Sequence, residues 1–279
     1  MQISNSNFPQ TSVIKPISDI VEEVRSGVVH IVHTVNGERK ASGTGFMVNG
    51  YLVTNYHVAY QAPHNSVVIL RTYDSNSQIL LDGIQLTHEN FLKTSVTASD
   101  DRGYDYIVFD LPELRKKRLY NFSLGNPNLK RMGDSILFLG YPFDQLNLTC
   151  HTGIISSLYK DTNIDIIQVD ASVNVSNSGG PLIDPNTSEV IGIITRKITG
   201  LTKTFEELRL IIEENIKFLA QNTQVSVQLG NLNPIQATIH NQYQILHLTH
   251  EIERSANVGI GHAFSIKELK NDNIFYAEE

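Results

Sequence analysis

The sequence predicts a mostly β protein with an α-helical insertion before its last strand. Short apolar runs rich in β-branched residues recur over residues 28–197, and turn residues separate them. Strands of this length and spacing are typical of barrels or of a sandwich. From residue 198 the apolar residues follow helical spacing, until residues 258–266 return to a strand pattern. The 279 residues allow one or two domains.

The N-terminal part of the chain is expected to hold an arm, a short helix and a hairpin. Residues 1–16 form the arm, and Ser18 is expected to cap a helix with acidic residues in its first turn. A β-branched strand follows at residues 28–35. The clearest hairpin spans residues 43–55, because Asn49-Gly50 between two apolar runs favours a type I′ turn.

Further strands continue to residue 197. They are expected at residues 66–71, 78–84 and 104–109, whereas residues 88–103 show no period. A basic linker over residues 112–121 separates the two β units. The later strands are expected at residues 133–141, 151–158, 164–169 and 190–195.

Residues 198–257 are expected to be the helical insertion. Residues 204–207 (Thr-Phe-Glu-Glu) fit a capping box, which would start the first helix. A second helix is expected from Asn233-Pro234 to about Arg254, with proline at its first helical position. Residues 258–279 would supply the final strand and a C-terminal segment. The first helix carries an apolar stripe at helical spacing, formed by Phe205, Leu208, Ile212, Ile216 and Leu219.

Composition argues against several classes of protein. A net charge of −7 provides no basic surface for nucleic acid. The single cysteine, Cys150, excludes an intrachain disulfide and is expected to be a small buried hydrophobe; there is no Cys/His pattern for a metal. Residues 1–11 lack the apolar core of a signal peptide, and no apolar run reaches the ~20 residues that span a bilayer. The chain is therefore expected in the cytoplasm.

Three residues stand in contexts that suit nucleophilic catalysis. Ser178 precedes two glycines and a proline, where the backbone can turn sharply and approach another molecule. His57 follows a predicted strand, and Asp105 opens another. A serine hydroxyl needs an imidazole to take its proton, and the imidazole needs a carboxylate to fix its tautomer. Other candidates exist for the acid and the nucleophile: Asp100, Asp101, Asp110 and Ser176.

The chain resembles trypsin-fold serine peptidases, and among them the HtrA/Deg type. The order His, Asp, Ser is that of chymotrypsin-like enzymes. The resemblance implies a chymotrypsin-like double β-barrel, with barrels over about residues 17–111 and 122–197, that cuts polypeptides in the cleft between the barrels without metal or cofactor. The matching segments, in family order, are residues 17–31, 43–46, 54–58, 105–108, 140–143, 151–156, 168–171, 177–182, 189–195 and 260–266.

The resemblance also implies a role for each site residue. His57 would be the general base and acid, Asp105 would orient it, and Ser178 would be the nucleophile that forms an acyl-enzyme. The oxyanion hole would be built by Ser176, Asn177 and Ser178. The substrate-binding residues would be Thr195, Arg196 and Lys197 on the strand that pairs with the substrate backbone, and Ala171 and Ser172 near the floor of the specificity pocket.

This chain departs from the family pattern at two places. The family usually has glycine two residues before the nucleophile, where this chain has Ser176, so the oxyanion site either forms when a partner binds or is built differently. A PDZ domain, usual after an HtrA-type peptidase, is not expected, and the 198–257 insertion takes the place of a short loop.

Three functions remain open: an active serine endopeptidase, a protease controlled by a protein that contacts residues 198–257, and a catalytically silent pseudo-peptidase that binds peptides or a partner protein. A regulated peptidase of narrow specificity is favoured, because free proteolysis in the cytoplasm would damage the host.

Overall fold

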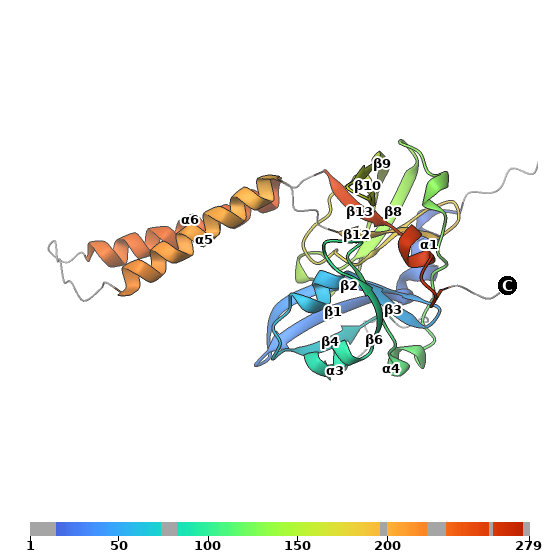
Figure 1. The fold of residues 1–279 in the computed structure, drawn as a ribbon, viewed down its shortest axis with the longest axis horizontal. Helices are drawn as coiled ribbons and strands as arrows, with labels where there is room; N and C mark the ends of the chain where they lie inside the picture. The colour runs from blue at the N-terminus through green and yellow to red at the C-terminus, as the bar shows by residue number, and fades with distance from the viewer. Residues whose placement is uncertain (1–14, 74–82, 196–199, 222–232, 257–258, 276–279) are drawn as a thin grey trace, which may run out of the picture.

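Strands form the body of the molecule, and two long helices extend from it (Figure 1). The computed structural model describes residues 15–73, 83–195, 200–221, 233–256 and 259–275. Two sheets follow one another along the chain, as the alternation of short apolar runs and turns predicts. The mostly β fold class is therefore confirmed.

The first sheet has seven strands in the order β5-β4-β1-β2-β3-β7-β6. In the hairpin between β2 and β3, Val48 pairs with Tyr51. Asn49 and Gly50 between them have φ angles of 49° and 82°, which confirms the type I′ turn that needs positive φ at both positions. The strands are β1 (Val28–Val35), β2 (Glu38–Val48), β3 (Tyr51–Thr54), β4 (Val67–Arg71), β5 (Ile84–Thr87), β6 (Ser95–Ser99) and β7 (Tyr106–Phe109).

The second sheet closes into a barrel in the order β10-β13-β12-β11-β8-β9. Its last strand, β13, comes from beyond the helical insertion and lies between β10 and β12. The segment after the insertion therefore completes the barrel, as the return to a strand pattern predicts. The strands are β8 (Ser135–Gly140), β9 (Thr149–Asp161), β10 (Ile164–Asp170), β11 (Pro181–Ile183), β12 (Val190–Thr195) and β13 (Gly261–Ser265).

Short helices connect these strands, and some of them correct the sequence prediction. The first helix begins at Ile17 with Pro16 as its N-cap, so the prediction that Ser18 caps it is wrong. Residues 88–103, which show no period, form a helix and an edge strand; the Thr87 side chain caps that helix by accepting from Asn90 N–H. The short helices are α1 (Ile17–Val24), α2 (Tyr56–Tyr60), α3 (His88–Lys93), α4 (Pro112–Arg115) and α7 (Lys267–Lys270), with 3₁₀ turns at Arg25–Gly27, Pro127–Leu129 and Pro142–Asp144.

The insertion is an antiparallel helical hairpin that projects from the body (Figure 1). Its helices are α5 (Gly200–Gln221) and α6 (Pro234–Ala256). Because α5 begins at Gly200, Thr204 lies inside the helix and the predicted capping box is wrong. No helix in the described part of the chain has the length and apolarity needed to cross a membrane.

One apolar cluster joins the two sheets. Phe46 and Val53 from the first sheet are buried against Leu139 and Ile193 from the second, together with Tyr141, which follows β8. Helix α1 contributes to the same cluster. This contact fixes the two sheets against each other, so residues at their junction are held by both. Cys150 lies outside the core and is exposed, which corrects the prediction that it is buried.

Candidate active site

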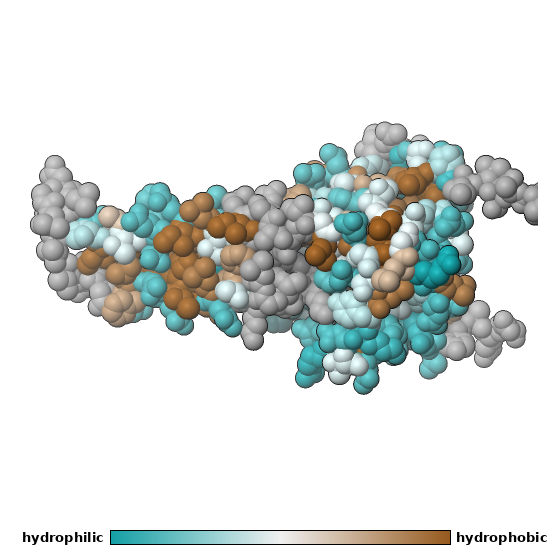
Figure 2. Space-filling view, turned by 90° about the horizontal axis from the view of Figure 1, so that it is seen from above, coloured by the Kyte–Doolittle hydropathy of each residue, from teal (hydrophilic) through white to brown (hydrophobic). Residues whose placement is uncertain are grey.

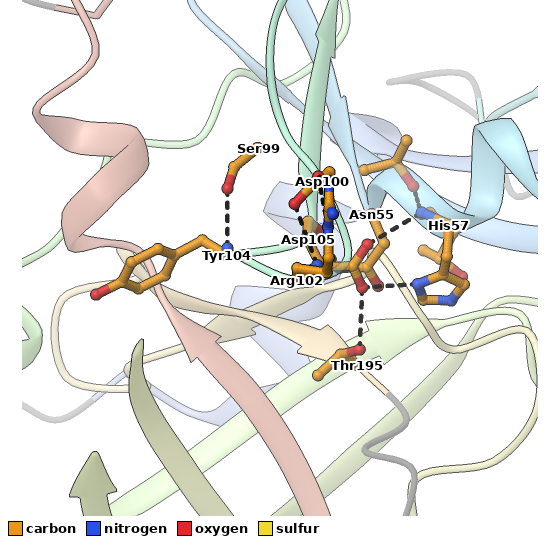
Figure 3. A network of polar contacts seen from close by, with 10 residues as sticks. Asn55, His57, Ser99, Asp100, Arg102, Tyr104, Asp105 and Thr195 are labelled. Carbon is orange, nitrogen blue, oxygen red and sulfur yellow. Dashed lines mark hydrogen bonds and ion pairs between the residues drawn. The ribbon is translucent and has the colours of Figure 1, made fainter. Parts of the chain in front are cut away.

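His57 is placed at the junction of the two sheets by a short helix. The strand β3 ends at Thr54, and α2 carries His57 in its first turn. Two bonds then tie His57 to Asp105 (Figure 3). The backbone N–H of His57 donates to Asp105 Oδ1 (3.0 Å), and its ring Nδ1 lies 2.7 Å from Asp105 Oδ2. With both carboxylate oxygens engaged, the imidazole has one fixed orientation.

Asp105 is held by the loop that precedes β7. Its backbone has a φ of 46°, a left-handed conformation that Asp tolerates better than most residues. The Asp105 N–H donates to Asp100 O (3.1 Å), and Asn55 Nδ2 donates to Asp105 O (2.8 Å). Arg102 at the loop tip donates to the Asp100 carboxylate and lowers the pKa of Asp100. Asp105 itself is buried, and Thr195 Oγ1 approaches its Oδ2 at 3.5 Å (Figure 3).

Ser178 lies in the loop before β11, and strand β2 of the other sheet anchors it. The N–H of Thr44 donates to Ser178 O (2.9 Å), and Gly179 N–H donates to Ile194 O (2.8 Å). Gly179 has a φ of 87°, and a Cβ there would lie 2.1 Å from Thr44 O. Only glycine fits this position, so the Ser-Gly pair of the sequence serves the close approach of the two sheets.

One cavity of about 660 Å³ brings the three residues together. His57, Asp105 and Ser178 all line it, as do Ser176 and Thr195. Among the described residues, no hydrogen bond joins Ser178 Oγ to His57 Nε2. Catalytic hydrogen bonds often form only once substrate binds, so a nucleophile and its base need not be bonded in the free protein.

The loop before Ser178 has the backbone shape that glycine usually provides. Ser176 has a φ of 73° and is buried, and its carbonyl oxygen accepts from Thr44 Oγ1 (2.7 Å). Asn177 is buried as well, does not line the cavity, and its N–H donates to Asn174 O (3.1 Å). The Asn177 N–H is therefore engaged within the loop, so of the three predicted oxyanion residues only Ser176 and Ser178 line the cavity.

The predicted substrate-binding residues are divided by the structure. Thr195 lines the cavity, whereas Arg196 and Lys197 lie outside the described residues. Ala171 packs in the apolar core of the second barrel, Ser172 is half-buried, and neither lines the cavity. The cavity wall is instead supplied by side chains that sequence reasoning did not select: Ser42, Arg102, Ile164, Ile166, His262 and Phe264.

The missed wall residues follow a signal that the sequence contains. His262 and Phe264 are two residues apart on β13, and Ile164 and Ile166 are two apart on β10. Residues at this spacing share one face of a strand. Alternation alone cannot show which face meets the cavity, because that depends on how the barrel closes. Within the described residues, no group of three or more His, Cys, Asp or Glu side chains is arranged to hold a metal ion.

Comparison with known proteins agrees with this fold. A family model described as the trypsin-like peptidase domain matches residues 43–193. The chain therefore belongs to the trypsin-like peptidase family. Its relatives include serine protease HTRA3 of Homo sapiens, 32% identical over 200 residues, and mitochondrial serine protease HTRA2 of Bos taurus, 32% identical over 203 residues.

These alignments cover part of each protein. They span 66% of this chain, 41% of the human protein and 39% of the bovine protein. The solved structure of Deg5 has a TM-score of 0.52 and 24% identity, covering 64% of this chain and 84% of that one. At this identity the likeness concerns the fold alone, which is that of a trypsin-like peptidase.

Proposed function

We propose that the chain is a serine endopeptidase that uses His57, Asp105 and Ser178. The observation that carries this proposal is the pair of bonds from Asp105 to the His57 backbone and ring, in the cavity that Ser178 also lines. An imidazole oriented by a buried carboxylate next to a serine is the arrangement that activates a serine hydroxyl. Membership of the trypsin-like peptidase family and the HtrA relatives support the same chemistry.

The reaction proceeds in two proton-balanced steps. Ser178 Oγ attacks the peptide carbonyl carbon while His57 Nε2 takes its proton, and the N–H groups of Ser176 and Ser178 stabilise the negative oxygen. His57 returns the proton to the amine as the C–N bond breaks, which leaves an acyl-enzyme on Ser178. Water then gives a proton to His57 and its hydroxyl to the acyl carbon, and Ser178 regains its proton. Neither metal nor cofactor takes part.

Covalent labelling tests the proposal directly. A fluorophosphonate probe should modify the wild type at Ser178, as located by mass spectrometry of tryptic peptides, and Ser178→Ala should abolish the modification. Ser157→Ala, a change of another serine on β9, is the matched control and should label like the wild type. A wild type that binds peptides yet stays unlabelled with every candidate partner would contradict the enzyme and favour the pseudo-peptidase.

We propose that specificity is narrow and that the cavity selects an apolar side chain at the P1 position. Ile164, Ile166 and Phe264 supply an apolar wall to the cavity, which Asp101 and Asp161 also line. The assignment rests on the apolar wall, and the two carboxylates make a basic P1 residue the competing outcome. A peptide library varied at P1 should be cut best after apolar residues. Cleavage confined to basic residues would contradict this assignment.

Regulation through the helical hairpin is the remaining part of the proposal, and it rests on an apolar stripe. Buried and half-buried residues recur every three or four positions where α5 and α6 meet, including Ile212 and Thr249. We call these positions the seam. A second, exposed apolar stripe lies one residue N-terminal to seam positions on each helix, so it is rotated by about 100° around the helix axis from the seam. Its six side chains are 39–66% exposed: Leu208, Ile211 and Phe218 on α5, and Ile245, Leu248 and Ile252 on α6.

The two stripes lie on the same face of the hairpin. Helices α5 and α6 are antiparallel and face each other across the seam. A shift of one residue toward the N-terminus therefore rotates away from the seam to the same side of the hairpin on both helices. Figure 2 shows apolar side chains along the hairpin. An exposed apolar face of this kind fits an amphipathic helix of another protein. We therefore propose that a regulatory protein in the cytoplasm binds the hairpin there.

Two matched variants test this docking face. A partner that binds it should lose its effect on Ser178 labelling when Ile211 is changed to Glu. The same change at Leu210, which is exposed on another side of α5, should leave the effect intact. Sedimentation of the chain alone would show a rising mass with concentration if a second copy occupies the face instead, and equal loss in both variants would contradict the assignment.

A further inference from the structure

Ser176 holds a backbone conformation that costs free energy for any residue other than glycine. Its φ of 73° is in the left-handed region, which disfavours a residue with a Cβ. Such a conformation persists only where the surroundings enforce it. The contacts of Ser176 should therefore show what stabilises the positive φ that glycine, the usual residue at this position, adopts without help.

Strand β2 supplies two of these contacts. Ser42 Oγ lies 2.8 Å from Ser176 Oγ, and Thr44 Oγ1 donates to Ser176 O at 2.7 Å. Ser42 and Thr44 are two residues apart on one strand, so their side chains point to the same side, toward Ser176. The Thr44 hydroxyl also accepts from Tyr141 N–H (3.1 Å), which ties this contact to the second barrel.

The peptide on the other side of Ser176 is also fixed. Phe143 N–H donates to Val175 O at 3.0 Å. The Val175–Ser176 peptide is trans, so its C=O and N–H point in opposite directions, and the Ser176 N–H points away from Phe143. Val175, Ser176 and Ser178 line the same cavity. The loop is thus held with its carbonyl oxygens bound by the protein, which is the arrangement an oxyanion hole requires.

We infer that Ser42 is a positioning residue for the oxyanion hole: its hydroxyl, through Ser176 Oγ, holds Ser176 in the left-handed conformation that presents the Ser176 N–H to the substrate oxyanion. The inference rests on the proposed function. It describes an oxyanion hole that is already formed around a serine before any partner binds. In this role Ser42 acts through Ser176.

A double-mutant experiment tests the inference because glycine at position 176 needs no hydroxyl to hold it. In the wild-type background, Ser42→Ala should lower kcat on the order of tenfold with little change in KM, the effect of losing one hydrogen bond that acts in the transition state. In the Ser176→Gly variant, Ser42→Ala should alter kcat less than about twofold relative to Ser176→Gly alone. The hydroxyl of Ser176, with which Ser42 interacts, is then absent. Ser42→Thr keeps the hydroxyl and should restore kcat.

The outcomes separate the inference from the proposed function. An equal loss of kcat from Ser42→Ala in both backgrounds, no loss in the wild type, or a loss that appears only in KM would overturn the role of Ser42 while the peptidase stands. A wild type that never labels at Ser178 would overturn the peptidase first, and the role of Ser42 with it. Labelling rates with a fluorophosphonate give a second readout, because the phosphonyl oxygen occupies the oxyanion site.

Discussion

At the scale of single residues, the site depends on side chains and on unusual backbone angles together. Asp105 and Ser176 both have positive φ, and both take part in hydrogen bonds between segments distant in sequence. Asp is among the residues that tolerate this conformation, whereas serine needs help from its neighbours. The two positions therefore respond differently to substitution, and Asp105 permits a clean test of chemistry without loss of fold.

Asp105→Asn is expected to inactivate the enzyme while leaving the fold intact. Asparagine has the same shape and tolerates positive φ, but its amide cannot hold the required His57 tautomer, so kcat should fall by roughly 10⁴-fold. The free energy of unfolding should change by a much smaller fraction than kcat does. Steady-state kinetics and urea unfolding measure the two effects. Asp110→Asn is the control, because Asp110 is partly exposed and pairs with Arg115; equal losses in both variants would contradict the role of Asp105.

His33 predicts how stability depends on pH. It is fully buried on β1, with its Nδ1 3.3 Å from Ser66 Oγ and its ring next to that of His88. Burial, and secondarily the charge of His88, lower the pKa of His33 to about 4 from 6.5. Between pH 6.5 and about 4 the unfolded chain binds this proton and the folded chain does not, so stability falls as pH falls through that window, by about 3 kcal/mol in total.

The measurement compares His33→Gln with the wild type by urea unfolding at several pH values. The variant lacks the acid-dependent loss of stability that His33 causes. From pH 7 to pH 4 its free energy of unfolding should therefore fall less than that of the wild type. His240→Gln on the exposed hairpin surface serves as the control. Parallel curves for His33→Gln and the wild type would show that His33 is not responsible.

At the scale of elements, local rules predicted the β-hairpin correctly but misplaced the start of α1 and of α5. The Asn49-Gly50 turn follows from conformational preference alone, and its φ angles agree. The helix α3 and the edge strand β6 were not predicted, because both are short and half exposed, so they carry little apolar periodicity. The context of His57, Asp105 and Ser178 could be read from the sequence, whereas the contact of Ser42 with Ser176 spans two sheets and left no local pattern.

The hairpin offers an element-scale prediction from two adjacent isoleucines. Ile212 is 4% exposed in the seam between α5 and α6, and Ile211 is 55% exposed on the apolar face. Ile212→Ala should open a cavity and destabilise the hairpin by about 2 kcal/mol, whereas Ile211→Ala should change its stability by less than about 0.5 kcal/mol. Hydrogen exchange of the α5 and α6 amides measures both. Equal effects would mean that the seam is assigned to the wrong face.

At the scale of the whole molecule, the hairpin is inserted between two strands of the barrel that a short loop could connect. Thr195 of β12 pairs with His262 of β13, and antiparallel partners have Cα atoms about 5 Å apart. A turn of a few residues can connect strands in this arrangement. The 60 residues from 198 to 257 are therefore far more than closure of the barrel requires, which agrees with their proposed role as a docking module.

Replacement of residues 198–257 by a short Gly/Ser linker should consequently leave a folded peptidase. Because β12 and β13 remain neighbours, the midpoint of thermal unfolding should shift by only a few degrees, the change that about 1 kcal/mol produces in a domain of this size. Ser178 should still react with a fluorophosphonate, and any response to a partner should be lost. A control with the linker in place of residues 222–232 retains both helices and should keep that response. Unfolding of the barrel, or loss of labelling in the replaced chain alone, would show instead that the hairpin supports the active site directly.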